Sequence, residues 1–194
     1  NIPAAQIETV EGGVVQTRHT AVVGKSDRQS PVLTTRIPEI NFHPFWTTPA
    51  SIVRKDLIPK MRSEPNYLTE NRIRIFNGQG QEVPSTSINW NTDEALKYRF
   101  RQDPGDFNSM GTVRINVPSP LGVYMHDTNS KGLFGDDARF HSSGCIRVRL
   151  GSVLALCVAP AALRRQPAIV DRAVEPFHIP FEQGLLDVLE NTER

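Results

Sequence analysis

The sequence predicts a β-rich fold, either all-β or α+β. Stretches of alternating apolar and polar residues recur along the first two thirds of the chain, whereas candidate helices are few. The regular alternation of strand and helix that a parallel sheet requires is absent. A length of 194 residues suits one domain, and 38% hydrophobic residues is ordinary for a folded protein. We therefore expect residues 1–194 to form a single domain with a substantial core.

The N-terminal part is predicted to be a β-hairpin followed by a loop and a short strand. Residues 8–24 alternate in the strand pattern on both sides of Gly12 and Gly13, which supply the turn. Residues 25–31 are polar and end in a proline, which indicates a loop, and residues 32–36 are predicted to resume a strand.

Residues 38–70 are predicted to be a capping insertion. Five prolines punctuate this stretch, aromatic residues cluster near its start, and residues 50–57 have helical spacing behind possible N-caps. Long ordered insertions of this kind often form lids or binding loops. We therefore expect a partly helical segment that lies over the domain.

The rest of the chain continues the β pattern and ends in two candidate helices. Residues 77–80 (Asn-Gly-Gln-Gly) are a strong turn signal behind an alternating strand. The predicted strands span residues 72–76, 98–102, 111–117 and 122–126, and the predicted helices span 152–163, interrupted by Pro160, and 181–190.

Composition and motifs exclude several classes of function. Lys and Arg (22) nearly cancel Asp and Glu (21), so a nucleic-acid partner is disfavoured. Two cysteines cannot make a disulfide scaffold, and neither zinc-type cysteine spacing nor a nucleotide or dinucleotide motif is present, so we expect no cofactor. No apolar run approaches the roughly 20 residues of a membrane span. The chain starts at Asn1 without a leader, which suggests a trimmed or processed chain whose targeting signal is not visible.

Reactive side chains concentrate between residues 124 and 147. His126 closes a predicted strand, and Cys145 opens another after 18 intervening residues. A free thiol is only a few per cent ionised at neutral pH, but an imidazole within reach can take its proton and later return it to a leaving group. Gly144 keeps the backbone uncrowded, so the Gly144 and Cys145 amides are candidate oxyanion donors. Ser142 and Ser143 give Cys145 polar flanks, which favours a reactive thiol over the commoner buried, inert one.

Three further residues are candidates for binding substrate. Arg147 lies on the same side of an extended strand as Cys145 and can bind a carboxylate with two hydrogen bonds. Arg139 can do the same from the loop or be a plain surface charge, and Tyr124 alternates in phase with His126, so it lines either the site or the core.

Other polar residues of this segment receive structural interpretations. Asp127 and Thr128 are interpreted as turn-forming residues. A metal site of His126, Asp136, His141 and Cys145 is disfavoured because no short zinc-type ligand pair exists. Cys157 has apolar helical neighbours and is expected to be a packed core thiol.

Three segments carry a resemblance to a known family: Asn108-Ser-Met-Gly111, His126-Asp-Thr128 and Ser142-Ser-Gly-Cys-Ile-Arg147. Over roughly residues 15–157 the chain resembles the L,D-transpeptidase (YkuD) catalytic domain. The resemblance implies a β-sandwich-like fold and a periplasmic or cell-envelope enzyme that attacks peptidoglycan tetrapeptide stems and forms 3→3 cross-links. It implies that Cys145 is the nucleophile, His126 the general base and then acid, and Arg147 the structural or carboxylate-binding arginine.

One position departs from the commonest family motif, which has a second histidine where this chain has Ser143. A subgroup of large enzymes of the YcbB type carries this serine together with a long capping insertion, which residues 41–59 resemble. The same site also fits an L,D-carboxypeptidase or endopeptidase, or an enzyme whose acyl acceptor is an envelope protein. An inactive peptidoglycan-binding module is the alternative outside enzymes, and a carbapenem is expected to acylate Cys145 in an active one.

Overall fold

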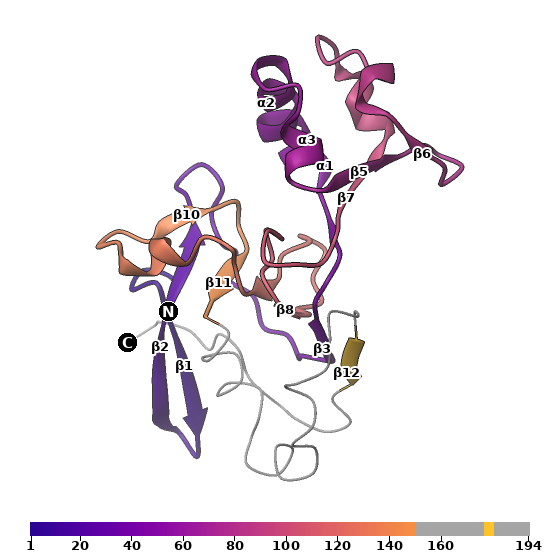
Figure 1. Ribbon diagram of the computed structural model, residues 1–194. Coiled ribbons are helices and arrows are strands. Elements are labelled where there is room, and N and C mark those ends of the chain that lie inside the picture. Colours follow the sequence, from indigo (N-terminus) through magenta and orange to yellow (C-terminus); the bar gives the residue numbers. More distant parts are fainter. Residues whose placement is uncertain (150–176, 181–194) are drawn as a thin grey trace. The chain divides into compact units, whose positions relative to one another are not determined.

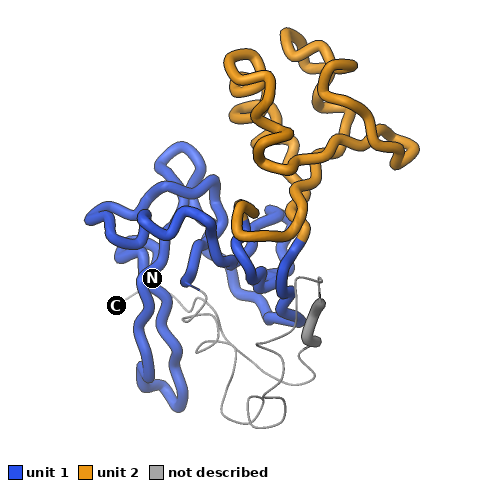
Figure 2. The backbone as a smooth tube through the Cα atoms, in the orientation of Figure 1, with its two compact units in different colours: residues 1–44, 110–194 blue, residues 45–109 orange. Residues whose placement is uncertain are grey.

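The computed structural model describes residues 1–149 and the backbone of residues 177–180. These residues fall into two compact units, which Figure 2 distinguishes by colour. Unit 1 consists of Asn1–Pro44 and Met110–Arg194, and unit 2 of Phe45–Ser109. The helices expected over residues 152–163 and 181–190, and Cys157, lie outside the described residues.

Unit 1 is built on a mixed β-sheet, and the fold is mainly β as predicted (Figure 1). Its strand order is β1-β2-β11-β9-β8-β3-β12, with β10 pairing with β2 off this path. The pairs β11–β9 and β10–β2 are parallel and the others are antiparallel. The elements of unit 1 are β1 (Gln6–Glu11), β2 (Val14–Gly24), β3 (Glu39–Phe42), β8 (Val113–Ile115), β9 (Met125–His126), the short helix η4 (Lys131–Gly135), β10 (Phe140–Ser142), β11 (Ile146–Val148) and β12 (Phe177–Pro180).

The predicted N-terminal hairpin is confirmed in β1 and β2. The two residues at its turn, Gly12 and Gly13, both have positive φ angles (58° and 78°), which only glycine adopts without strain. The predicted strands at 111–117 and 122–126 are also present, although the paired parts, β8 and β9, are shorter.

The central strands of unit 1 turn alternate residues toward a hydrophobic core. Ile115, Met125 and Val148 lie on the core face of β8, β9 and β11. Their neighbours within the strands, Arg114, His126 and Arg147, therefore lie on the opposite face. The buried residues of this core are Ile7, Ala21, Ile37, Ile40, Val113, Ile115, Val117, Met125 and Val148.

The stretch before β3 corrects two sequence-based expectations. Residues 32–36 do not form the predicted strand; Leu33 packs against the core and the Thr35 hydroxyl donates a hydrogen bond to the Pro118 carbonyl (3.0 Å). The strand instead lies at β3, which pairs with β8 inside the segment assigned to the insertion. The flanking prolines obscured this strand in the sequence, because they interrupt any long alternating pattern.

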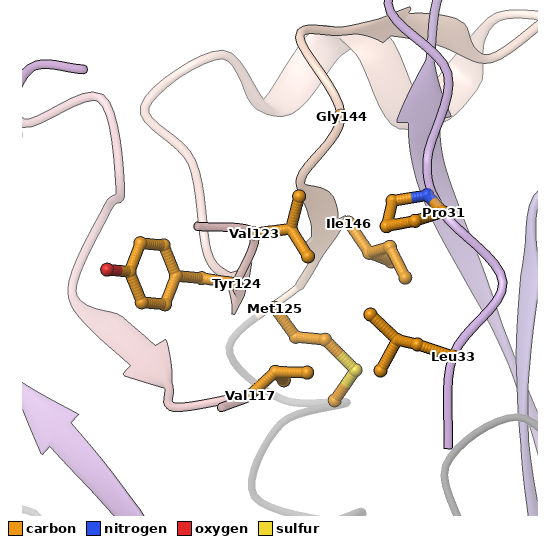
Figure 3. Close-up of a pocket in the computed structure, with 8 residues that line it drawn as sticks. All are labelled: Pro31, Leu33, Val117, Val123, Tyr124, Met125, Gly144 and Ile146. Atoms are coloured by element: carbon orange, nitrogen blue, oxygen red, sulfur yellow. The ribbon is translucent and has the colours of Figure 1, made fainter. Parts of the chain in front are cut away.

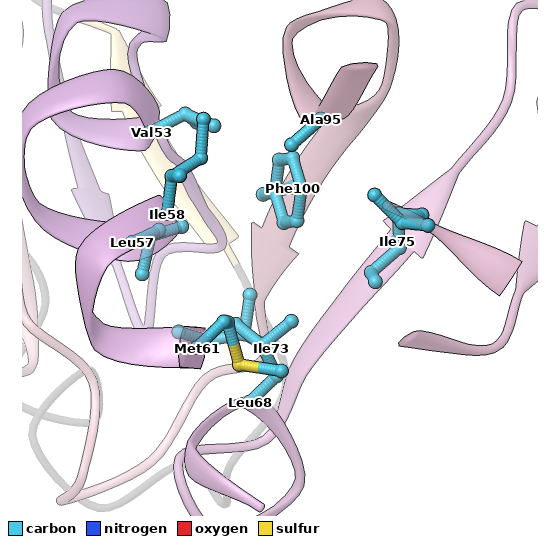
Figure 4. Packing of buried hydrophobic residues seen from close by; sticks show 10 residues of the cluster. Val53, Leu57, Ile58, Met61, Leu68, Ile73, Ile75, Ala95 and Phe100 are labelled. Atoms are coloured by element: carbon cyan, nitrogen blue, oxygen red, sulfur yellow. The ribbon is translucent and has the colours of Figure 1, made fainter. Parts of the chain in front are cut away.

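Unit 2 packs short helices against one face of an antiparallel sheet with the strand order β4-β7-β5-β6. Its core comes from alternate residues of these strands and from the helices, as Figure 4 shows. The elements are β4 (Trp46–Thr47), α1 (Ala50–Ile52), η1 (Val53–Leu57), α2 (Ile58–Ser63), α3 (Tyr67–Glu70), β5 (Ile73–Phe76), β6 (Glu82–Val83), η2 (Ser85–Ser87), η3 (Asp93–Lys97) and β7 (Arg99–Gln102).

The predicted helix at residues 50–57 is confirmed and extends to Ser63, past Pro59. Proline lacks an N–H and its ring collides with the carbonyl four residues earlier. The chain widens into a π turn just before it, in which the Ile58 N–H bonds to the Val53 carbonyl five residues back. This local widening explains why a proline inside the segment does not end it.

The strands within and after residues 38–70 belong to two different sheets. β3 belongs to the sheet of unit 1, whereas β5 and β7 form one sheet with β4. Unit 2 spans residues 45–109, and a capping insertion over residues 38–70 stays a prediction. A role for this segment as a lid stays a prediction.

Candidate active site

Three strands of unit 1 bring the reactive residues of the motif onto one sheet face. In register, His126 of β9 lies opposite Arg114 of β8 on one side and Arg147 of β11 on the other. Paired residues in a sheet point to the same face, and Cys145, which directly precedes β11, is near enough to Arg147 for the two groups to affect each other's pKa. The face away from the core therefore carries the thiol, the imidazole and two guanidinium groups.

The position of His126 determines which of its nitrogens can act as a base. The side chain is 6% exposed, and its Nδ1 is hydrogen-bonded to the backbone carbonyl of Asp127. A carbonyl oxygen can only accept, so Nδ1 carries the proton and the Nε2 lone pair is the basic one. Burial and, secondarily, the charge of Arg147 lower the pKa of His126 to about 4. Hydrogen bonds to the Asp127 and Met110 backbone raise this pKa, but by less. His126 is therefore neutral at neutral pH.

Cys145 is also neutral in the resting site. Burial raises the pKa of the Cys145 thiol, and this outweighs the opposing effects of a hydrogen bond from the Tyr124 backbone and of the positive charge on Arg147. Among the described residues no hydrogen bond joins the Cys145 and His126 side chains. The pair is thus a thiol and a neutral imidazole on one face, rather than a preformed thiolate–imidazolium ion pair.

The turn that carries the thiol is held by Ser142. Its hydroxyl donates to the Cys145 carbonyl (2.5 Å) and accepts from the Gly144 N–H (3.2 Å), while Gly144 has a φ of 112° that favours glycine. The Gly144 amide, predicted as an oxyanion donor, is therefore already engaged in this structure. The Cys145 amide has no hydrogen-bond partner among the described residues, so its oxyanion role stays a prediction.

A loop at residues 25–30 supports this turn, and sequence reasoning missed it. The buried Ser30 hydroxyl donates to the Gly144 carbonyl (2.9 Å) and accepts from the Gly24 N–H (3.0 Å). Arg28 Nη1 donates to the Ser143 hydroxyl (2.9 Å). The contacts with Gly144 and Ser143 join residues more than a hundred positions apart, and a polar loop gives no local sequence signal of them.

Asp127 is a second residue that sequence reasoning undervalued. The sequence indicated a turn-forming residue. In the structure Asp127 is 1% exposed, and its carboxylate accepts hydrogen bonds from the Thr112 N–H (3.2 Å), the Thr112 hydroxyl (3.1 Å) and Lys131 Nζ. A Cβ on Gly111 would lie 2.5 Å from this carboxylate. These contacts fix the peptide whose carbonyl orients His126, which gives the glycine of the Asn108–Gly111 motif a physical reason.

The two candidate substrate-binding arginines have different surroundings. Arg147 has a buried Nε without a hydrogen-bond partner and no carboxylate partner among the described residues. Arg139 instead donates to three backbone carbonyls, those of Ala21 (3.2 Å), Asp136 (2.9 Å) and Ala4 (3.2 Å). Arg139 therefore ties the loop before β10 to the N-terminal part of unit 1, and the structure gives its expected substrate role no support.

The Tyr124 ring lies on the sheet face that carries Arg114 and His126. The Arg114 guanidinium lies 5.1 Å from the centre of the Tyr124 ring. A small apolar pocket adjoins Gly144, and in Figure 3 the Tyr124 ring points away from the Met125 and Ile146 side chains that line it. The ring thus belongs to the reactive face and not to the core.

The described residues give no indication of a metal centre or a membrane span. They contain no group of three or more metal-ligating side chains; His141 Nε2 lies 2.9 Å from Asp136 Oδ2 as a simple pair. No helix among them is long and apolar enough to cross a membrane.

Comparison with known proteins agrees with these features. Residues 1–157 match the YkuD family, described as the L,D-transpeptidase catalytic domain. The chain is also 36% identical over 156 residues to a Haemophilus influenzae protein named "Putative L,D-transpeptidase". The match covers 80% of this chain and 32% of that protein, so the chain spans about a third of its curated relative's length. With the family matched over most of the sequence, the chain belongs to the YkuD family of L,D-transpeptidase catalytic domains.

Proposed function

We propose that this chain is the catalytic domain of a peptidoglycan L,D-transpeptidase that works through an acyl-enzyme on Cys145. The observation that carries the proposal is the placement of Cys145, His126 and Arg147 on one sheet face of a YkuD-family chain. A thiol, a base of defined tautomer and a guanidinium without a carboxylate partner among the described residues are the groups that acyl transfer from a carboxylated peptide needs.

In the first step Cys145 Sγ attacks the carbonyl carbon of the L-to-D peptide bond in a donor tetrapeptide stem. Because the thiol and the imidazole are both neutral at rest, the Sγ proton moves to His126 Nε2 as the S–C bond forms. The C–N bond then breaks, and the terminal D-alanine leaves with the proton that His126 returns. Arg147 binds a carboxylate of the stem.

In the second step an amine of another stem attacks the thioester. The S–C bond breaks, the new amide forms a 3→3 cross-link between two diaminopimelate residues, and the amine proton returns through His126 to the sulfur. Ser142, Ser143 and Gly144 support the turn that holds Cys145 in both steps.

Several finer statements accompany this proposal. The Ser143 position favours the YcbB-type subgroup, and a peptidoglycan substrate implies action in the periplasm or cell envelope, with a part in cell-wall organisation and cell shape. A carbapenem is expected to acylate Cys145, because its strained ring presents a reactive carbonyl to the thiol. Water in place of the amine would make the enzyme a carboxypeptidase or endopeptidase, and an envelope protein's amine would make it an anchoring enzyme.

Mass spectrometry of the chain with a disaccharide-tetrapeptide, with and without a second amine acceptor, tests the proposal. An adduct on Cys145 that is converted to a 3→3 dimer is the expected result. Release of tripeptide alone would favour the hydrolase. Absence of any adduct on a chain with a verified free thiol would favour the inactive binding module and overturn the acyl-enzyme.

A further inference from the structure

The sheet of unit 2 has an outer face, opposite its apolar core, on which arginines gather around aromatic rings. In register, Arg74 of β5 lies opposite Arg101 of β7, and Phe76 of β5 lies opposite Arg99 of β7. The four side chains therefore share one face, next to Phe45, the residue before β4. We call Phe45, Arg74, Phe76, Arg99 and Arg101 the arginine face.

Arg101 packs against two aromatic rings on this face. Its guanidinium lies 4.6 Å from the centre of the Phe45 ring and 4.7 Å from that of Phe76, and its Nε is buried without a hydrogen-bond partner. Stacking between two rings fixes the plane of a guanidinium and leaves the donors at its edge available. Because little side-chain freedom remains to be lost, such an arginine is prepared for a planar acceptor such as a carboxylate.

The neighbouring Arg74 shows which ligand suits this face. Its Nε and Nη2 both donate to Asp103 Oδ1, at 3.0 and 2.8 Å, and its Nη1 lies 3.6 Å from Glu82. Arg99 and Arg101 have no carboxylate partner of this kind among the residues that the structure describes. An external carboxylate would complete the pattern.

The need to shield Phe76 from solvent does not by itself explain why three arginines surround it. Phe76 is 7% exposed and has three guanidinium groups around it: Arg101, Arg99 at 5.4 Å and Arg74 at 5.6 Å. Arg99 is exposed, so its charge is open to solvent. A densely charged polyphosphate fits poorly, because Glu82 and Asp103 border the face and would repel it. Carboxylates spaced along a peptide fit better.

We propose that the arginine face binds carboxylates of peptidoglycan stem peptides and so attaches unit 2 to the polymer. This inference rests on the proposed function, since the substrate class comes from it. Arg99 and Arg101 are the binding residues, and neither takes part in acyl transfer.

The test is co-sedimentation of the chain with purified insoluble peptidoglycan, carried out in the Cys145→Ala variant so that catalysis plays no part. Arg99→Gln with Arg101→Gln should weaken binding about tenfold at low ionic strength, as two charge-assisted contacts are lost. Arg54→Gln with Lys55→Gln removes the same charge from an exposed helical segment of the same unit and should leave binding unchanged. Equal binding by both double variants, or an equal loss in both, would overturn the proposal.

Two additions keep the result interpretable. Amidation of the carboxyl groups of peptidoglycan should weaken its binding to the chain with Arg99 and Arg101 intact. The loss should equal that caused by Arg99→Gln with Arg101→Gln on native peptidoglycan. If the amidated polymer binds as well as the native one, carboxylate recognition is excluded. Arg99→Lys with Arg101→Lys keeps the charge but loses the planar fork and should restore binding only in part. Full restoration would show a plain charge effect and overturn the stacked carboxylate site.

The outcome is separate from that of the proposed function. With Cys145 intact, the Arg99→Gln/Arg101→Gln variant should acylate on a soluble disaccharide-tetrapeptide at the unsubstituted rate. Failure of all chains to acylate would contradict the proposed function, whereas loss of polymer binding in the double variant alone would still support the arginine face.

Discussion

Each of the two units has a sheet with one apolar face and one face that carries arginines, yet the two polar faces differ in kind. In unit 1 the face joins Arg114 and Arg147 to His126 and Cys145, and burial shifts the pKa values of the imidazole and the thiol. In unit 2 the arginines lie over Phe45 and Phe76, and among the described residues no thiol or imidazole interacts with them.

This difference shows that arginines alone do not make a sheet face a reaction site. The proposed chemistry of unit 1 needs a nucleophile and a base as well, and burial there raises the pKa of the Cys145 thiol and lowers that of His126, so that both are neutral at rest. In unit 2 the same residue type, stacked on rings, is suited to recognition alone. The predictions below test this distinction.

Removing the thiol should have the largest effect. Cys145→Ala should abolish acyl-enzyme formation, because no other described residue on the face is a nucleophile, and should leave the midpoint of thermal unfolding nearly unchanged. Intact-protein mass after incubation with a tetrapeptide stem measures the first, and a thermal melt the second. An adduct on the alanine variant would contradict the assignment of unit 1 as the reactive unit.

Removing the base should have the next largest effect. His126→Gln should slow acylation by about 10²–10⁴-fold, the usual contribution of a positioned general base. Single-turnover acylation rates at pH 7 measure it. His19→Gln, on the hairpin of unit 1, is the matched control and should acylate at the unsubstituted rate; an equal loss there would point to a general effect on folding.

Acid should destabilise unit 1 through His126. The pKa of His126 is about 4 in the folded chain, against an ordinary value near 6.5, so the unfolded chain binds this proton first as the pH falls. The contribution of neutral His126 is complete above pH 6.5 and is lost as the pH falls toward 4, by roughly 3 kcal/mol. Between pH 7 and pH 4 the free energy of unfolding measured in urea should therefore fall less in His126→Gln than in the unsubstituted chain. An equal fall in both chains would contradict a buried neutral imidazole at His126.

Loosening the turn beneath the thiol should have a moderate effect. Ser30→Ala leaves the Gly144 carbonyl and the Gly24 N–H without their shared partner, which should lower the free energy of unfolding by about 1–3 kcal/mol. Acylation should slow as well, because the Cys145 turn loses a support. Ser87→Ala, in a short helix of unit 2, is the control for urea unfolding and acylation rate, and equal effects would remove Ser30 from the site.

A surface pair in unit 2 should have the smallest effect. Arg54 lies 3.3 Å from Asp93, and both side chains are largely exposed. Arg54→Gln should change the free energy of unfolding by less than about 1 kcal/mol and leave acylation unchanged, since solvent screens such a pair. Chemical denaturation measures this, and a larger loss would show that unit 2 depends on surface charge more than on its core.

Much of the fold follows from local sequence pattern. The hairpin around Gly12 and Gly13, the strand before the turn at residues 77–80 and the helical segment after Pro49 are all readable from side-chain periodicity and turn chemistry. The motifs around His126 and Cys145 likewise determined the family, because acyl transfer constrains residue types at neighbouring positions.

Only the tertiary structure decided how those residues are held. Ser30 and Gly144, or Arg139 and Ala21, meet across more than a hundred residues, and no local pattern reports a hydrogen bond between them. The sequence indicated only a turn residue at Asp127, whereas in the structure its carboxylate is buried. Periodicity records which face a side chain takes, whereas desolvation and polar partners depend on what the rest of the chain places against that face.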